Sequence, residues 1–165
     1  MADVARVQPA QTDKLAVVSQ TTLSVDDAAE ITAAVKARFP KIREPKQQDI
    51  CYATQNRQDA VKLMSRQVDA VVVVGSPTSS NTNRLRELAE RLGVPAHMVD
   101  DASELRDEWF AGRTRVGVTA GASAPEDLVQ GVVQRLKALG AVSVRSLDGV
   151  RETTKFPLPK GLKVE

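Results

Sequence analysis

The chain has few aromatic residues, one cysteine and almost no net charge. Aromatic side chains make up 3% of its 165 residues, which argues against binding single-stranded nucleic acid by base stacking. The formal net charge of +2 is too small to indicate a nucleic-acid or membrane partner. Because Cys51 is the only cysteine, an intramolecular disulfide is excluded, as is typical of proteins in a reducing compartment.

Long apolar runs and targeting signals are also lacking. The longest apolar run, Ala70–Val74, has the length of a strand and is too short to cross a membrane. The opening sequence MADVARVQPAQTDK has neither the basic nor the apolar region of a signal peptide. We therefore expect a cytoplasmic protein. Its content of 42% hydrophobic and 27% charged residues is typical of a folded globular domain.

What is present is an alternation of short apolar runs and amphipathic segments, which predicts an α/β fold with a mainly parallel sheet. Strands are expected at 15–19, 69–75, 94–99, 115–119 and 142–147. Helices are expected at 25–39, 53–66, 82–92, 102–110 and 125–139, with Ala60, Val61 and Met64 as the buried stripe of the second. Residues 41–49 are expected to form a linker, and 151–165 a polar tail.

Three of the apolar runs are followed by a loop rich in small polar residues and then by a predicted helix. These loops contain Thr21, Thr22 and Ser24; Ser79, Ser80, Asn81 and Asn83; and Gly121, Ser123 and Pro125. Helix N-termini attract anions, and the carboxyl ends of parallel strands meet at one edge of a sheet. One such loop is more often only a well-capped helix, but three together favour a small, strongly anionic ligand. None of them matches a Walker or dinucleotide-binding motif.

Cys51 lies in DICYATQNRQ, directly before a predicted helix, where the helix terminus stabilises a thiolate. This position favours metal ligation or reactivity, and the alternative is an inert buried cysteine. One cysteine leaves any cluster held by this chain alone short of ligands. Structural or capping roles are expected for His97, Asp100, Asp101 and Trp109.

Six segments together resemble the LytB/IspH family of 4-hydroxy-3-methylbut-2-enyl diphosphate reductases, over about residues 14–159. They are QTTLSVDD, RFPKI, DICYATQNRQ, GSPTSSNTNRL, VGVTAGASAPEDLVQ and VVQRL. The resemblance implies a trefoil of three small α/β modules around a cavity, each giving one cysteine to a [4Fe–4S] cluster. It also implies that ferredoxin or flavodoxin donates electrons, and that the allylic hydroxyl of the diphosphate substrate is removed to give isopentenyl and dimethylallyl diphosphate.

The resemblance also implies roles for individual residues. Cys51 matches a cluster cysteine, and Thr21 matches a catalytic threonine near the substrate hydroxyl. The expected diphosphate-binding residues are Ser79, Ser80, Asn81 and Ser123. These residues belong to the loops that the polar pattern indicates for an anion.

The chain departs from the family pattern by matching only its C-terminal half. The other cluster cysteines, two substrate-binding histidines and a proton-transfer glutamate have no counterpart here. Residues 1–46 are therefore expected to form half of a middle module plus linker, 47–140 a complete third module, and 141–165 a strand and tail that pack on the first module. The isolated chain is expected to bind diphosphate weakly and to lack reductase activity.

Two alternatives stay open at this point. Beside the reductase interpretation, the chain could be a stand-alone phosphate- or diphosphate-binding module without redox chemistry, or a fragment that works only with a separate N-terminal half. Whether Met1 is the true start is also open.

Overall fold

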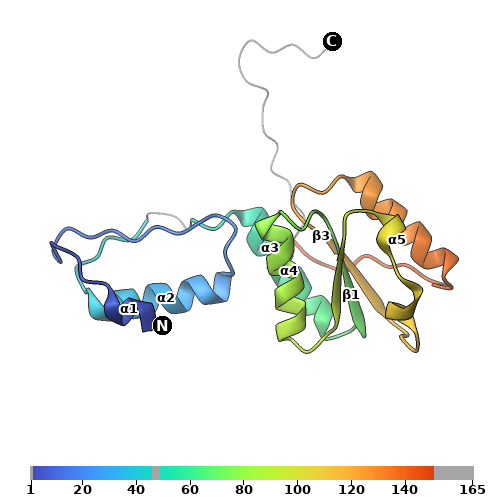
Figure 1. Cartoon of the computed structure of the whole chain (residues 1–165), viewed down its shortest axis with the longest axis horizontal. Helices are drawn as coiled ribbons and strands as arrows, with labels where there is room; N and C mark the ends of the chain where they lie inside the picture. Colours follow the sequence, from blue (N-terminus) through green and yellow to red (C-terminus); the bar gives the residue numbers. More distant parts are fainter. Residues whose placement is uncertain (1, 46–48, 151–165) are drawn as a thin grey trace, which may run out of the picture.

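The computed structural model describes residues 2–45 and 49–150, which form two parts (Figure 1). We call residues 2–45 and 49–50 the lobe and residues 51–150 the module. The predictions for residues 151–165 lie outside the described residues. In the described ranges, no helix has the length and hydropathy needed to cross a membrane.

The module contains a three-stranded parallel sheet in the order β2-β1-β3, which confirms the predicted fold class. Its strands are β1 (Ala70–Val74), β2 (Ala96–Val99) and β3 (Val116–Ala120). The helices are α3 (Tyr52–Ser65), α4 (Ser80–Arg91) and α5 (Glu126–Ala138). At the centre of the sheet, Val72 lies between His97 and Val118.

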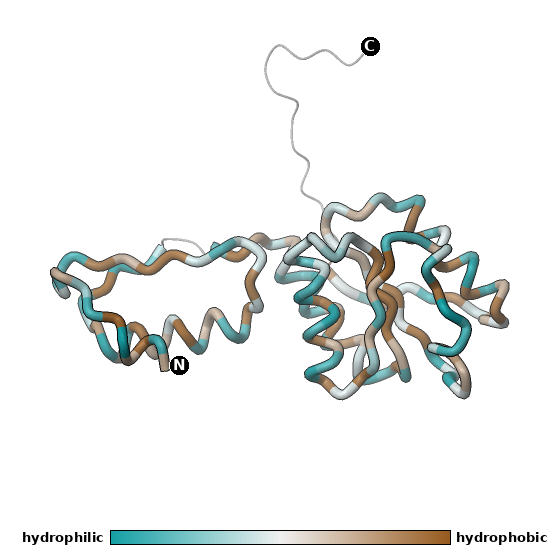
Figure 2. The backbone as a smooth tube through the Cα atoms, viewed as in Figure 1, coloured by the Kyte–Doolittle hydropathy of each residue, from teal (hydrophilic) through white to brown (hydrophobic). Residues whose placement is uncertain are grey.

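The sheet is covered by helices on both faces. One apolar cluster joins alternate residues of β1 to α3 and α4, and the other joins the intervening residues to α5. All residues of β1 are fully buried, as expected for a strand of successive valines in a parallel sheet. Figure 2 shows the corresponding concentration of apolar residues along the strands.

The lobe contains α1 (Ala2–Arg6) and α2 (Val25–Arg38). Helix α2 begins as predicted, because Ser24 Oγ accepts a hydrogen bond of 3.2 Å from the Asp27 N–H. It ends at Arg38, and its C-cap residue Phe39 lies directly before Pro40. No residue of α2 is buried, and its Ile31 is 46% exposed.

The predicted strand at 15–19 is wrong. This segment forms only an isolated parallel bridge between Ala16 and Arg43. Arg43 belongs to the segment 41–49, which was predicted to be a linker. Hydrogen bonds from Val17 N–H to Arg43 O (3.0 Å) and from Arg43 N–H to Leu15 O (2.9 Å) hold the bridge. A two-stranded contact without a third strand is too small to extend into a sheet.

Three further predictions need correction. The helix expected at 102–110 is two 3-10 turns, Ala102–Glu104 and Asp107–Phe110, because Leu105 between them is extended and buried in the core. Ala60 is exposed, and the buried face of α3 consists of Thr54, Gln58, Val61, Met64 and Ser65. The strand expected at 142–147 is absent: Val142 is 100% exposed, and only Leu147 packs against the core.

Candidate functional site

Helices α3, α4 and α5 all begin at the carboxyl edge of the sheet. Helices α4 and α5 follow the carboxyl ends of β1 and β3 directly. Helix α3 leads through residues 66–69 into the amino end of β1, so its own first turn lies at the opposite, carboxyl edge. Near the amino end of β3, a Cβ atom on Gly117 would lie 2.5 Å from Met64 Sδ, which places the last turn of α3 there. The topology therefore brings the start of α3, whose N-cap is Cys51, to the same edge as the two polar loops.

The β1–α4 and β3–α5 loops meet around Thr82. A Cβ atom on Gly121 would lie 2.4 Å from Thr82 Oγ1, and one on Gly75 would lie 2.7 Å from it. Gly75 also has a φ of 142°, which other residues rarely adopt. The Gly121 N–H donates to Val74 O at 2.9 Å. Glycine at these two positions is therefore what allows the two loops to lie side by side.

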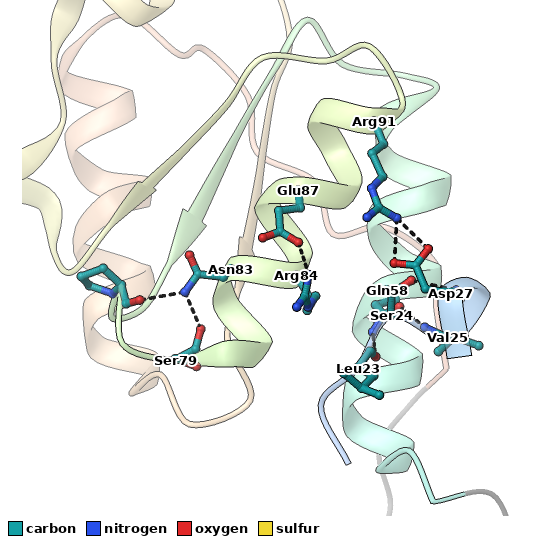
Figure 3. A network of polar contacts seen from close by, with 11 residues as sticks. Leu23, Ser24, Val25, Asp27, Gln58, Ser79, Asn83, Arg84, Glu87 and Arg91 are labelled. Carbon is teal, nitrogen blue, oxygen red and sulfur yellow. Dashed lines mark hydrogen bonds and ion pairs between the residues drawn. The ribbon is translucent and has the colours of Figure 1, made fainter. Parts of the chain in front are cut away.

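Asn83 braces the β1–α4 loop from within. Its Nδ2 donates to Pro77 O (2.7 Å) and to Ser79 O (3.0 Å), as Figure 3 shows. Ser79 caps α4 by accepting from the Thr82 N–H at 3.3 Å. The sequence pattern grouped Asn83 with the donors available to a ligand, but its amide donates to the loop itself.

Asn81 is the exception among the polar side chains of this loop. It is 6% exposed, and neither its Nδ2 nor its Oδ1 has a hydrogen-bond partner among the described residues. Its Nδ2 lies 3.9 Å from where a Cβ atom on Gly121 would stand, so the amide faces the neighbouring loop. Leaving a buried amide unpaired costs on the order of 1–3 kcal/mol, and such groups commonly bind a ligand or water.

Two exposed serines lie in the same two loops. Helix α4 begins at Ser80, earlier than predicted, so Ser80 and Asn81 both lie in its first turn. Ser123 lies in a turn closed by a 3.0 Å hydrogen bond from Ala124 N–H to Gly121 O. Both serines are exposed at the surface. The carboxyl edge thus combines two helix N-termini with small side-chain donors, an arrangement suited to an anion.

Cys51 occupies the N-cap position of α3, and its thiol is exposed. The Cys51 N–H donates to Thr21 O at 3.0 Å, so these two residues lie together. Thr21 is exposed as well. The structure therefore brings Thr21 beside Cys51, and the Ser79–Asn81 turn beside the loop that carries Ser123.

The residues present do not fit a complete iron–sulfur cluster. Cys51 is the only cysteine of the chain. Across 2–45 and 49–150, no group of three or more His, Cys, Asp or Glu side chains is arranged to hold a metal. A thiolate at Cys51 supplies one ligand, and a cluster bound at three cysteines needs two more from outside this chain.

The other residues singled out by the sequence contribute to packing and capping. The His97 and Trp109 rings stack with centroids 4.2 Å apart, and burial lowers the pKa of His97. Asp101 caps the first 3-10 turn by accepting from the Ser103 N–H at 2.7 Å. Sequence reasoning missed Gln58, a polar residue at helical spacing from Val61 on the buried face of α3.

Comparison with known proteins identifies the family of the chain. The model of the family described as "LytB protein" matches residues 1–137. A 4-hydroxy-3-methylbut-2-enyl diphosphate reductase of a Polaromonas species is 75% identical over 165 residues, 100% of this chain and 50% of that protein. The protein of the same name from Ralstonia nicotianae is 66% identical, over 98% of this chain and 50% of its own length.

A solved structure of another diphosphate reductase also matches this chain, at lower sequence identity. The E-1-hydroxy-2-methyl-but-2-enyl-4-diphosphate reductase from Plasmodium falciparum is 33% identical, with a TM-score of 0.88 over 96% of this chain and 51% of that one. The chain spans about half the length of the curated relatives it matches. Since the family model covers most of the sequence and close relatives match it from end to end, the chain belongs to the LytB protein family.

Proposed function

We propose that this chain is part of a 4-hydroxy-3-methylbut-2-enyl diphosphate reductase and supplies its diphosphate-binding edge. The observation that carries the proposal is the buried Asn81 amide, unpaired among the described residues and located where the two polar loops meet. The relatives of that name match nearly the whole of this chain. Because this chain covers only half the length of those relatives, its part in reductase activity is a proposal.

The diphosphate is proposed to bind at the first turns of α4 and α5. The free N–H groups of these turns supply partial positive charge, which suits the diphosphate oxygens. Ser80, Asn81 and Ser123 add donors from both loops. The Ser79 hydroxyl accepts from Thr82 within the cap and keeps its own O–H for the ligand.

Thr21 and Cys51 form the second element of the proposed site. The Thr21 hydroxyl is proposed to bind the substrate hydroxyl. Cys51 is proposed to give one thiolate to a [4Fe–4S] cluster completed by residues outside this chain, for example in a separate N-terminal half. In the cytoplasm, ferredoxin or flavodoxin is the proposed electron donor.

The proposed architecture is the one that the family resemblance implies. Residues 1–46 form part of a middle module and 47–140 a third module of a three-module trefoil, with 141–165 packing on the first. The exposed apolar side chains of the lobe, such as Val18 at 80% exposed, support a neighbour there.

Calorimetry with an allylic diphosphate tests the binding site. We expect the chain to prefer dimethylallyl diphosphate to ADP, and Ser80→Ala to weaken its binding roughly tenfold, as loss of one hydrogen bond to a charged group does. The matched control is Ser143→Ala, an exposed serine away from the proposed site. Two residues later, Arg145 bonds to Gln67, which lies in the α3–β1 connection at the opposite, amino edge of the sheet. Equal binding of ADP would instead favour a general phosphate-binding module.

Anaerobic reconstitution with iron and sulfide tests the role of Cys51. The chain alone is expected to assemble no stoichiometric cluster and to show no reductase turnover, because it has one of three cysteine ligands. Addition of a relative's N-terminal half should restore the cluster absorbance. A stoichiometric cluster with activity in the chain alone would refute this part of the proposal.

A further inference from the structure

The lobe is attached to the module through a small polar junction at the start of α2 (Figure 3). The junction consists of Gln58 with its backbone partners, and of two ion pairs, Asp27–Arg91 and Asp26–Lys62. It joins the first turn of α2 to α3 and α4. None of these side chains has a role in the proposed function.

Gln58 is the buried centre of the junction, with only 2% of its surface exposed. Its Nε2 donates to Leu23 O at 2.9 Å, and its Oε1 accepts from the Val25 N–H at 2.9 Å. The Val25 N–H belongs to the first turn of α2, where backbone N–H groups lack partners within the helix. Gln58 therefore caps α2 from another helix, and both ends of its amide are paired.

The segment that Gln58 holds also carries Thr21. The Cys51 N–H donates to Thr21 O at 3.0 Å, and Gln58 contacts the same loop at Leu23 and Val25. Cys51 and Gln58 are separated by about two turns of α3, so they contact the loop from one face of that helix. The loop is thus fixed at both ends by α3.

The ion pairs support this arrangement from the solvent side. Arg91 Nη1 lies 2.8 and 3.0 Å from the two Asp27 carboxylate oxygens, and Lys62 Nζ lies 2.8 Å from Asp26 Oδ1. Both pairs are substantially exposed, and exposed pairs contribute little to stability individually. The buried amide of Gln58, paired at both ends, is therefore the contact with the most to lose if the loop moves.

We propose that Gln58 is a positioning residue, which fixes the Thr21–Ser24 loop, and with it Thr21, against Cys51 at the carboxyl edge of the sheet. The inference rests on the proposed function only in assigning Thr21 and Cys51 to the site. The position of the loop itself is measurable without any ligand.

Hydrogen exchange of the full chain tests the proposal through the Cys51 amide, whose partner is Thr21 rather than Gln58. Gln58→Met has a similar volume without the polar groups, and it should speed exchange at Cys51 about tenfold, as loss of roughly one net hydrogen bond does. The amide of Val72, within the sheet, should be unchanged. The control Gln130→Met should change neither rate, because within residues 2–45 and 49–150 the Gln130 side chain bonds only to Glu126 of the same helix, α5.

Gln58→Glu separates positioning from packing. At pH 7.5 its carboxylate can accept from Val25 but cannot donate to Leu23, whereas at pH 5 the protonated acid does both, since burial raises a carboxyl pKa. Protection of Cys51, relative to wild type at the same pH, should therefore return at pH 5 in Gln58→Glu but not in Gln58→Met. The charged groups at the junction include Asp26, Asp27, Lys62 and Arg91, and Arg84 and Glu87 of α4 lie close enough to act on the Asp27–Arg91 pair. Asp27 stays ionised at pH 5, because its hydrogen bond with Arg91 lowers its pKa.

Unchanged Cys51 exchange in Gln58→Met, or the same protection in Gln58→Glu at both pH values, would overturn the proposal. If Gln58→Met also exposes Val72 and so fails to fold, Gln58→Glu decides. Protection of Cys51 and Val72 at the wild-type level at pH 5 would show that this variant folds, so faster Cys51 exchange at pH 7.5 would then report the lost donor to Leu23 O. Failure of diphosphate binding would leave all these rates as expected, so it would count only against the proposed function.

Discussion

Replacing Asn81 by leucine should stabilise the ligand-free chain and weaken its binding of diphosphate. The Asn81 amide is buried, and both of its polar atoms lack partners among the described residues. An apolar side chain of similar shape removes the desolvation cost of that amide, which is about 1–3 kcal/mol. The same change removes donors proposed to face the ligand, so affinity should fall roughly ten- to a hundredfold.

Asn83 provides the matched control, because it lies two residues away in the same helix turn and its amide is paired. Its Nδ2 donates to Pro77 O at 2.7 Å and to Ser79 O at 3.0 Å. Asn83→Leu should therefore destabilise the chain by about 1–3 kcal/mol, the opposite sign to Asn81→Leu. The contrast depends only on which amide is paired in the folded state.

Urea denaturation followed by fluorescence measures both variants, since Trp109 is the only tryptophan and lies half-buried against His97. Isothermal calorimetry with inorganic diphosphate gives the affinities. If Asn81→Leu destabilises the chain as much as Asn83→Leu does and leaves the affinity unchanged, the reasoning about the unpaired amide is wrong.

Two further predictions concern the module. Asp69 accepts hydrogen bonds from the Thr114 hydroxyl and from two backbone N–H groups, which lower its pKa to about 2. The contribution of Asp69 to the free energy of unfolding is thus complete above the unfolded pKa near 3.8 and is lost as the pH falls toward 2. In an acid titration, the free energy of unfolding of Asp69→Asn should therefore fall less steeply over this range than that of the wild type. Gly121→Ala should destabilise the chain by about 1–3 kcal/mol, because its Cβ would lie 2.4 Å from Thr82 Oγ1. Gly149→Ala, where the added Cβ meets no atom within 4 Å, should be neutral in the same urea titration, and equal effects would argue against the close approach of the two loops.

The module could be predicted from the sequence because its local signals agree with its packing. The run Ala70–Val74 is apolar throughout and is buried on both faces. Ser24 and Ser79 are strong N-cap residues and do cap their helices. Two of the three hydroxyl-rich loops precede α4 and α5. Their position at one edge of the sheet was predictable because the carboxyl ends of parallel strands meet at the same edge.

The rest depended on contacts between distant residues. The segment 15–19 has strand-like composition, yet a strand needs neighbours, and Ala16 meets only Arg43. Leu105 interrupts the predicted helix because its side chain is buried in the apolar cluster between the sheet and α5. Gln58 looks like any polar helix residue, and its importance arises from Leu23 and Val25, which lie more than thirty positions away in the sequence.

The absence of buried residues from α2 has a consequence for how the chain comes apart. A helix of 14 residues with no buried side chain is only marginally stable on its own, so the lobe should open well before the sheet does. A protease at low concentration would cut the lobe first and leave the β1–β3 core whole. The sole tryptophan lies in that core, so a smooth fluorescence transition would miss an earlier event that exchange or proteolysis detects.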